Sequence, residues 1–371
     1  MLGRKHLIET LFNRAGIKIN GPNPWDIQVN DERLYARILR DKSMGLGEAY
    51  MEGMWDCKQV DEFMHRILAA NLDREIKGGV KMLLPYLSAL FLNHQSRRRS
   101  HWVAKRHYDL GNDLFMSFLD PYNQYSCAYF SGTEDLKQAQ INKMELICQK
   151  IGLGREDRIL DIGSGWGGFS RYAAERYGCD VTAVNISGEQ IRYAGEFCKG
   201  LPVRILNCDY RDIRGVFDKV VSVGMFEHVG QKNYKTFMRG VARCLKNDGI
   251  FLLQTIGGNN SQIKCDPWTA RYIFPNSMLP SIAQIGKAAE DLFVMEDWQN
   301  LGPHYDKTLM AWNDNFQKAW PSLKKRCNER FRRMWEYYLL SCAGAFRARY
   351  IQIWQIVFTK CGARQPDCRL S

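Results

Sequence analysis

Two patterns of apolar positions divide the chain. Up to about residue 75, apolar residues recur every three or four positions, in 31–42 and again in 60–71, which is the spacing of one face of a helix. From about residue 134, helical segments alternate with short apolar runs that are typical of buried strands. The sequence therefore predicts a small, mostly helical domain over 1–75 and an α/β domain after it.

The second pattern specifies the α/β domain strand by strand. We expect strands at 158–163, 180–187, 203–209, 218–228 and 250–258, a late strand at 349–360, and helices at 134–151, 167–178, 188–200 and 233–249. Strands that alternate with helices at this spacing form a parallel sheet covered on both faces. The predicted fold class is therefore α/β, with a Rossmann-like, doubly wound sheet.

The segment 76–100 is expected to be a basic linker between the two domains. It holds an apolar run, 82–92, followed by an arginine cluster at 97–99 close to Trp102. The apolar run contains Pro85 and is too short to span a bilayer. Apolar, aromatic and basic residues in this order fit a helix lying at a membrane interface, and they fit a solvated linker packed on its own protein equally well.

Charge and composition narrow the class of partner. The net charge of +12 indicates an anionic partner, either nucleic acid or an anionic membrane, unless the protein is simply a basic soluble enzyme. No nucleic-acid-binding motif accompanies the charge, which favours the membrane. The segment 44–55 is rich in methionine, and such segments either adapt to acyl chains or fill a core.

The cysteines and the first residues bear on the compartment. The chain has 371 residues, which suggests two domains, and 12 cysteines without a C-x-x-C pair. We expect reduced thiols in a cytoplasmic protein and no metal site. Since no long apolar run precedes a small-residue cleavage site, no signal peptide is expected.

A glycine-rich turn follows the first predicted strand of the sheet. In "ILDIGSGWGG" Asp161 ends the strand, and Gly163, Gly165 and Gly168 satisfy the G-x-G-x-x-G spacing of nucleotide-binding turns. The next strand ends in Asn185 rather than in the acidic residue that holds an NAD ribose. This combination favours S-adenosylmethionine over NAD.

The end of the third predicted strand offers a place for the adenine. Asp209 and Tyr210 follow that strand, where an adenine amino group and ring face would be bound. The alternative for Asp209 is a loop carboxylate paired with Arg211 or Arg214.

Longer motifs add a family resemblance that covers essentially the whole chain. They are "HYDLGNDLF" (107–115), "YSCAYF" (125–130), "LDIGSGWGG" (160–168), "VSVGMFEHVG" (221–230), "DPWTARYIFPNSMLPS" (266–281) and "CAGAFRAR" (342–349). With them the chain resembles the cyclopropane-fatty-acyl-phospholipid synthases and the mycolic acid cyclopropane synthases. The resemblance implies a class I S-adenosylmethionine-dependent methyltransferase domain over 101–371.

The resemblance also implies a reaction. Members of the family transfer a methyl group from S-adenosylmethionine to a cis double bond of a phospholipid acyl chain, and loss of a proton then closes a cyclopropane ring. An alkene is a weak nucleophile, so the methyl group must be held against it in a dry site. The resulting carbocation is stabilised by π faces and negative charge, so the chemistry gives no role to a nucleophilic thiol at Cys127.

Site residues are carried over from the family one position at a time. In the family the base that removes the proton is understood to be bound bicarbonate, and its cradle here would be Cys127, Glu227, Gln254, Ile256 and Tyr305. Residues carried over for the cofactor are Tyr125, Ser126, Gly163, Gly165, Asn185, Gln190, Tyr210 and Arg211, to which the strand pattern adds Asp161 and Asp209. Backbone N–H groups near Cys127 and Ile256 and the Tyr305 hydroxyl would donate to the anion.

Two positions depart from the family pattern. Gln254 stands where the family usually has histidine, and Asn185 where threonine is common. A glutamine amide can donate a hydrogen bond as a neutral histidine does, but it cannot shuttle a proton. We expect activity to be retained, and a Gln254→His variant much more active than the parent would contradict this.

Several further candidates carry two interpretations each. Cys342 could carry a reactive thiol, but the mechanism needs none, and a buried cysteine is the alternative. The segment His107–Asp109 could cover the cofactor. Alternatively it is structural, and Asp109 or Asn112 starts a helix. His228 is expected to support Glu227 indirectly. The aromatic and apolar candidates for an acyl-chain channel, which are equally typical of core, are Trp268, Tyr272, Phe274 and Met278.

The sequence thus predicts a cytoplasmic enzyme associated peripherally with the inner face of a membrane. The expected partners are phospholipid acyl chains and an anionic membrane surface, not nucleic acid, and a homodimer is compatible with the sequence. One rival hypothesis is a methyltransferase that acts on a small amine or methylates lipid without ring closure. The other is a lipid-binding protein with an inactive methyltransferase domain.

Overall fold

The computed structural model describes residues 2–72, 111–261 and 265–369. These residues form two units. The first, the helical unit, contains the described part of 1–91 with Cys265–Pro275 and Tyr305–Ile351; the second, the sheet unit, contains the rest. The predicted linker at 76–100 and the candidates His107, Tyr108 and Asp109 lie outside the described residues.

The sheet unit is built on seven strands in the order β5-β4-β3-β6-β7-β9-β8. Their bounds are β3 Arg158–Ile162, β4 Asp180–Asn185, β5 Val203–Asn207, β6 Phe217–Val223, β7 Leu245–Gly258, β8 Val294–Asn300 and β9 Ile351–Thr359. The strands β3 to β7 pair in parallel, which confirms the predicted parallel sheet. The sheet as a whole is mixed because β8 pairs antiparallel with β9.

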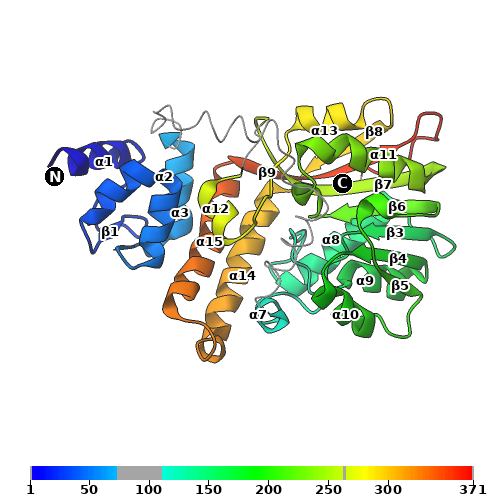
Figure 1. Ribbon diagram of the computed structural model, residues 1–371, viewed down its shortest axis with the longest axis horizontal. Helices are drawn as coiled ribbons and strands as arrows, with labels where there is room; N and C mark the ends of the chain where they lie inside the picture. The colour runs from blue at the N-terminus through cyan, green and yellow to red at the C-terminus, as the bar shows by residue number, and fades with distance from the viewer. Residues whose placement is uncertain (1, 73–110, 262–264, 370–371) are drawn as a thin grey trace. The chain divides into compact units, whose positions relative to one another are not determined.

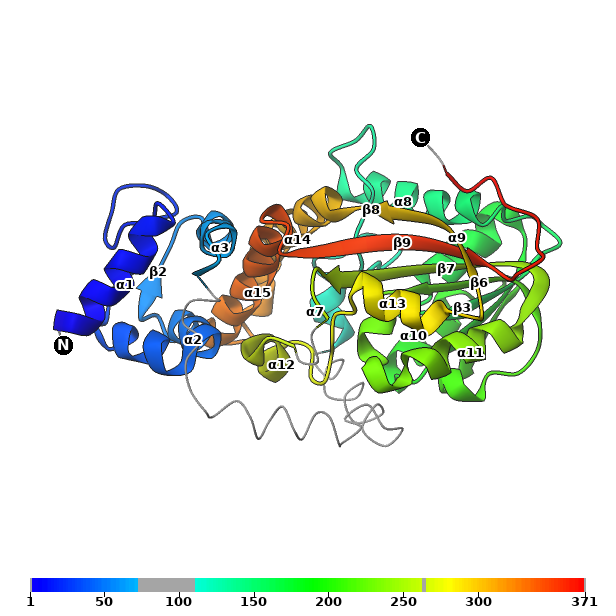
Figure 2. The same ribbon diagram turned by 90° about the horizontal axis from the view of Figure 1, so that it is seen from above.

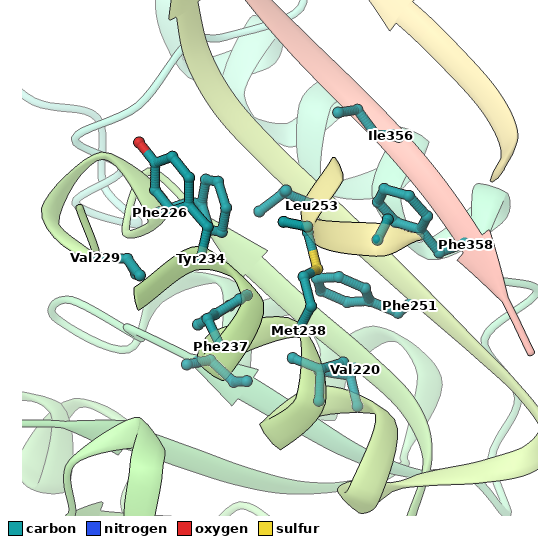
Figure 3. Close-up of a cluster of buried hydrophobic side chains, with 14 of the residues drawn as sticks. Val220, Phe226, Val229, Tyr234, Phe237, Met238, Phe251, Leu253, Ile356 and Phe358 are labelled. Carbon is teal, nitrogen blue, oxygen red and sulfur yellow. The ribbon is translucent and has the colours of Figure 1, made fainter. Parts of the chain in front are cut away.

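Helices cover both faces of this sheet (Figure 2). α8 (Leu136–Lys150) and α9 (Gly168–Tyr177) pack on one face, and α11 (Tyr234–Cys244) and α13 (Ile282–Ala289) on the other. α10 (Gly188–Phe197) connects β4 to β5. Figure 3 shows the core under α11 and α13, where aromatic side chains from β7, β9 and α11 meet. Among the described helices, none combines the length and the apolar character needed to cross a membrane.

Two predicted boundaries in the sheet unit are wrong. The helix predicted over 233–249 ends at Cys244, and β7 begins at Leu245. Leu245 misleads because it continues the apolar stripe of the helix, yet it is buried opposite Phe217 in the strand ladder. The strand predicted over 218–228 ends at Val223 and is followed by a 3₁₀ turn, η3 (Phe226–His228).

The helical unit joins the N-terminal helices to segments from much later in the chain (Figure 1). It consists of α1 (Leu2–Arg14), α2 (Arg33–Met51), α3 (Val60–Ala69), a short β1 (Gln28–Val29) and β2 (Trp55–Asp56) pair, α12 (Pro267–Tyr272), α14 (Gly302–Leu323) and α15 (Glu329–Arg347). α15 packs closely on α3, since a Cβ at Gly344 would lie 2.3 Å from the Asp61 carbonyl oxygen. That a separate N-terminal domain ends near residue 75 stays a prediction.

Ion pairs reinforce the packing of the helical unit. The Arg347 guanidinium lies 2.8 Å from Asp61, 3.4 Å from Glu62 and 3.0 Å from Asp306. It thereby connects α15 to both α3 and α14. Because these side chains are only partly exposed, the pairs are less screened than surface pairs.

The methionine-rich segment 44–55 is part of this unit's core. Tyr50, Met51, Met54 and Trp55 are buried, and Trp268 of α12 contacts the Met51 sulfur. The interpretation of the segment as a lipid-adapting surface is therefore wrong for these side chains.

The four candidates for an acyl-chain channel do not lie in one unit. Trp268, Tyr272 and Phe274 pack inside the helical unit, whereas Met278 belongs to the core of the sheet unit.

Candidate active site

The predicted site residues follow the carboxyl ends of the parallel strands. Asp161 and Gly163 come at the end of β3, Asn185 ends β4, Asp209 follows β5, and Glu227 follows β6. Parallel strands bring these ends to one edge of the sheet, which is where open α/β sheets bind ligands. These residues therefore lie along one edge of the sheet.

The glycine turn after β3 is held by the neighbouring strand. The Gly163 N–H donates to the Val184 carbonyl at 2.9 Å, and Gly163 has φ +84°, a conformation that glycine adopts readily. The Asn185 amide donates to the Gly165 carbonyl and to Gln190 Oε1, both at 3.0 Å. Three predicted cofactor residues from separate elements are thus linked by hydrogen bonds.

Asp161 lies beneath this turn as a buried acid. It accepts a hydrogen bond from the Ser170 hydroxyl at 2.7 Å. Burial raises the pKa of Asp161 to about 6, against the opposing effects of Ser170 and Lys143. The carboxylate therefore orders the start of α9 from inside the protein.

At the end of β5, Asp209 makes the ion pair that its alternative interpretation expected, and its contact with adenine stays a prediction. Asp209 pairs with the Arg211 guanidinium at 2.9 Å and also accepts the Arg211 N–H at 3.0 Å. The guanidinium in turn stacks over the Tyr210 ring, 4.6 Å from its centroid. The three side chains form one cluster at the sheet edge.

The segment 120–127 packs against the same glycine turn. A Cβ at Gly168 would lie 1.8 Å from the Tyr122 carbonyl oxygen, so only glycine permits this approach. Tyr125 packs edge-on against Phe115 of the short helix α7 (Asn112–Met116) at 5.2 Å. Cys127 is fully buried, and its S–H donates to the Ala128 carbonyl at 3.2 Å.

Helix α7 begins at Asn112, as one interpretation expected, although the N-cap residue is Gly111 and no side chain caps the helix. The Asn112 side chain instead accepts the Trp166 indole N–H of the glycine turn at 2.9 Å.

Glu227 and Gln254 each leave one buried polar atom unmatched. Glu227 Oε1 accepts the Ile256 N–H at 2.6 Å, and Gln254 Oε1 accepts from the Gln355 amide at 3.0 Å. Glu227 Oε2 and Gln254 Nε2 are buried and have no hydrogen-bond partner among the described residues. Burial raises the pKa of Glu227 to about 7. An unmatched acceptor and an unmatched donor are what a small polar ligand would satisfy.

The remaining predicted residues are placed as follows. Tyr305 belongs to the helical unit, where its ring packs on Phe346 at 4.6 Å, while the other four cradle residues belong to the sheet unit. Cys342 lies on α15, and burial raises its thiol pKa to about 12, which keeps it protonated. Burial lowers the pKa of His228 to about 4, so this side chain is neutral.

Sequence reasoning missed three buried polar residues around this edge. Gln355 of β9 holds Gln254, and Gln140 and Lys143 of α8 hold the segment 124–126. Gln355 stands in an otherwise apolar strand, and Lys143 falls on the apolar stripe of the predicted helix 134–151. The sequence signal that could have identified these residues is a polar side chain at a position where the pattern predicts a core residue.

Fold and site together define a class I S-adenosylmethionine-dependent methyltransferase. Residues 94–356 match the mycolic acid cyclopropane synthetase family. The chain belongs to this family.

Relatives and solved structures agree with this assignment. The chain is 51% identical over 350 residues to the cyclopropane-fatty-acyl-phospholipid synthase of Escherichia coli strain K12, covering 94% of this chain and 92% of that protein. The cyclopropane synthase CmaA1 in complex with SAH and CTAB has a TM-score of 0.66 at 32% identity, over 70% of this chain and 98% of that one. Coclaurine N-methyltransferase has a TM-score of 0.69 at 20% identity over 85% of this chain and 99% of that one, which shows the shared fold.

Proposed function

We propose that this protein transfers a methylene unit from S-adenosylmethionine to the cis double bond of unsaturated phospholipid acyl chains, forming a cyclopropane ring. The observation that carries the proposal is that Glu227 Oε2 and Gln254 Nε2, which both lie near the sheet edge, are buried and have no hydrogen-bond partner among the described residues. Membership of the family and 51% identity to a cyclopropane-fatty-acyl-phospholipid synthase support it.

The residues at the sheet edge fit the cofactor. S-adenosylmethionine, when bound, supplies the reactive methyl group as a sulfonium. The glycine turn lets the cofactor approach the backbone, and Asn185 and Gln190 close one side of that turn. Tyr210, backed by Arg211, offers a ring face for the adenine. Tyr125 and Ser126 would contact the cofactor from the segment that packs on Gly168.

The residues at Glu227 fit bicarbonate, with one correction. Bicarbonate, when bound, supplies the base that removes a proton from the delivered methyl group. Glu227 Oε2 would accept the hydrogen bond of its O–H group, and Gln254 Nε2 would donate to one of its oxygens. The Ile256 N–H was expected to donate to the anion, but Glu227 Oε1 already accepts it. Ile256 therefore holds Glu227 in place.

The substrate brings a membrane into the proposal. Unsaturated phospholipid acyl chains reside in a bilayer, so the enzyme must reach a lipid surface to act on them. We place it in the cytoplasm at the inner face of the membrane, in line with the net charge of +12. We also propose that the protein can form a homodimer.

The decisive experiment uses the full chain with vesicles of unsaturated phospholipid and S-adenosylmethionine. We expect fatty acids one methylene unit heavier that carry a cyclopropane ring in gas chromatography with mass spectrometry. Removing dissolved carbon dioxide and bicarbonate should lower the rate, and adding bicarbonate should restore it. Methyl-branched products without a ring would support the simple methyltransferase instead, and cofactor binding without any lipid product would support a small-amine substrate.

A further inference from the structure

Helix α8 carries a lysine that is buried without a carboxylate partner. Lys143 is fully buried, and its ammonium group donates to Gln124 Oε1 and, at 3.1 Å, to Ser126 Oγ. No carboxylate lies within ion-pair distance of it among the described residues; Asp120 and Asp161 act on it only at longer range. Burial lowers the pKa of Lys143 to about 8. Burying a charge against neutral partners is unfavourable for folding.

One helical turn away, Gln140 binds the backbone of the same segment. Its amide donates to the Ser126 carbonyl at 2.9 Å and to the Gln124 carbonyl at 3.3 Å. Gln140 is fully buried as well. The two side chains of α8 therefore hold both the backbone and the side chains of Gln124–Ser126.

The other side of this segment rests on the glycine turn. The Gly168 Cα lies so close to Tyr122 and Gln124 that a Cβ would overlap both. Asp120 fixes the same segment by accepting the Tyr122 and Gln124 N–H groups at 2.8 and 2.7 Å. The segment is thus confined between α8 and the turn that would bind the cofactor.

We infer that Lys143 and Gln140 are positioning residues that set the affinity for S-adenosylmethionine by fixing Tyr125 and Ser126 against the glycine turn. The inference rests on the proposed function, because that proposal places the cofactor at Tyr125 and Ser126. A methionine would fill the Lys143 site without a buried charge, so stability alone does not account for the lysine. Its ammonium group ties the side chains of Gln124 and Ser126 to α8.

The same helix supplies a matched control. Lys150 is also buried, but it pairs with Asp297 at 2.9 Å, away from the segment 120–127. We compare Lys143→Met with Lys150→Met by calorimetric titration of S-adenosylhomocysteine, thermal unfolding, and steady-state kinetics on lipid vesicles.

Lys143→Met should raise the Kd at least tenfold and raise the KM for S-adenosylmethionine more than it lowers kcat. Lys150→Met should lower the Tm, since it leaves Asp297 without its partner, and keep the Kd within twofold of the parent. A Kd within twofold of the parent in Lys143→Met overturns the inference, as does an equal rise in both variants.

If Lys143→Met does not fold, Gln140→Leu decides. It removes only neutral hydrogen bonds and should raise the Kd several-fold; an unchanged Kd overturns the inference. Failure of the parent chain itself to bind S-adenosylhomocysteine would instead contradict the proposed function.

A second, independent observation concerns the turn between α14 and α15 together with the adjoining ends of both helices. Residues 317–333 contain seven basic residues and one acidic residue, which is half of the net charge of +12. Lys318, Lys324 and Lys325 are exposed and have no ion-pair partner among the described residues, while Arg332 and Arg333 are held by carboxylates. The half-buried Trp320 lies among these lysines.

We propose that this basic turn, residues 317–333, contacts the anionic phospholipid surface from which the enzyme takes its substrate. Clustered lysines beside an aromatic side chain have the chemistry of a bilayer interface. This proposal depends on the proposed lipid substrate. The exposed lysines of the described sheet unit, such as Lys137, Lys232 and Lys287, provide a control of equal charge.

The test is sedimentation with vesicles that contain phosphatidylglycerol. Replacing Lys318, Lys324 and Lys325 by alanine should weaken binding by roughly a hundredfold at low salt, from about fivefold for each lysine. Replacing Lys137, Lys232 and Lys287 should weaken it by much less. Equal effects of the two triple variants on vesicle binding overturn the proposal. A parent chain that binds vesicles but forms no cyclopropane would contradict the proposed function alone.

Discussion

Cys127 shows how burial decides between two roles for one side chain. The thiol is fully buried, and its S–H group is hydrogen-bonded to a backbone carbonyl. A catalytic thiolate must be accessible to its substrate, and a fully buried thiol is not. The contacts of Cys127 fit a role for its backbone better than nucleophilic chemistry.

Cys127→Ser should therefore remain active. A hydroxyl can occupy the same site and donate to the same carbonyl, so we expect less than about a tenfold loss of kcat/KM, whereas loss of a nucleophile lowers activity on the order of 10⁴-fold or more. The product assay with lipid vesicles measures this directly. Near-complete loss in a variant that still binds S-adenosylhomocysteine would return Cys127 to the role of nucleophile.

Replacing Glu227 is expected to have opposite effects on the stability and on the activity of the protein. Because burial raises its pKa from 4.5 to about 7, the folded state holds the proton more tightly than the unfolded state does. The carboxylate therefore destabilises the fold progressively as the pH rises from about 4.5 to about 7, by about 3 kcal/mol in all at 1.36 kcal/mol for each pKa unit.

Glu227→Gln removes this pH-dependent penalty and keeps an oxygen for the Ile256 N–H. Relative to the parent, the variant should gain resistance to urea between about pH 5 and about pH 8, while activity falls on the order of a hundredfold or more because the ionised acceptor is lost. Urea unfolding at both pH values checks the first effect. A difference between variant and parent that does not change with pH would show that the carboxylate is already compensated.

At the scale of elements, the start of α9 depends on a close approach between two backbones. Gly168 begins this helix, and the 120–127 segment passes directly over it. Gly168→Ala would place a methyl group 1.8 Å from the Tyr122 carbonyl oxygen. Since the Tyr122 carbonyl oxygen is a backbone atom, rotating a side chain cannot relieve this clash.

We expect Gly168→Ala to displace the 120–127 segment and abolish cofactor binding, as measured by calorimetry with S-adenosylhomocysteine. Gly195→Ala is the control, because Gly195 lies within α10 with open space around it. Alanine there should stabilise the protein by about 0.5–1 kcal/mol. Unimpaired binding in Gly168→Ala would mean that the segment can move without consequence.

The elements that sequence predicted well are those with a strong local signal. Gly178 ends α9 where the pattern placed the end, in the left-handed conformation that favours glycine. β8 was missed because it shows no alternation and leaves Val294 and Met295 exposed at 43% and 42%. Lys143 was missed because its partners come from a different part of the chain.

At the scale of the whole molecule, local sequence patterns could not predict which segments pack together in each unit. The packing of α15 on α3 joins residues nearly 300 positions apart, such as Asp61 and Arg347, and no periodicity reveals such a pairing. The candidate site was easier to predict than this grouping, because Asp161, Asn185 and Glu227 each follow a recognisable strand. The sequence located Glu227 and its neighbours by their positions after predicted strands. Only the structure reveals that some of their polar atoms are buried without a hydrogen-bond partner.

The grouping predicts the outcome of a truncation. Removing residues 1–72 would uncover the face of α15 that packs on α2 and α3, including Tyr337, whose ring lies 5.5 Å from that of Tyr50. The shortened chain should therefore bind a hydrophobic dye and lose cooperative thermal unfolding of the helical unit. Truncation is consequently a poor way to measure the part that the N-terminal helices play in lipid binding. A shortened chain that unfolds as sharply as the parent would contradict this.

The position of β9 has a consequence for synthesis. β9 comes from the last part of the chain, yet it lies between β7 and β8 inside the sheet. Its Trp354 occupies the space over Gly257, where a Cβ would overlap the indole. While the ribosome is still making this strand, β7 has an open edge on that side and β8 has no antiparallel partner. The sheet can therefore be completed only after translation has passed residue 359, and a nascent chain that stalls earlier exposes a strand edge prone to aggregation.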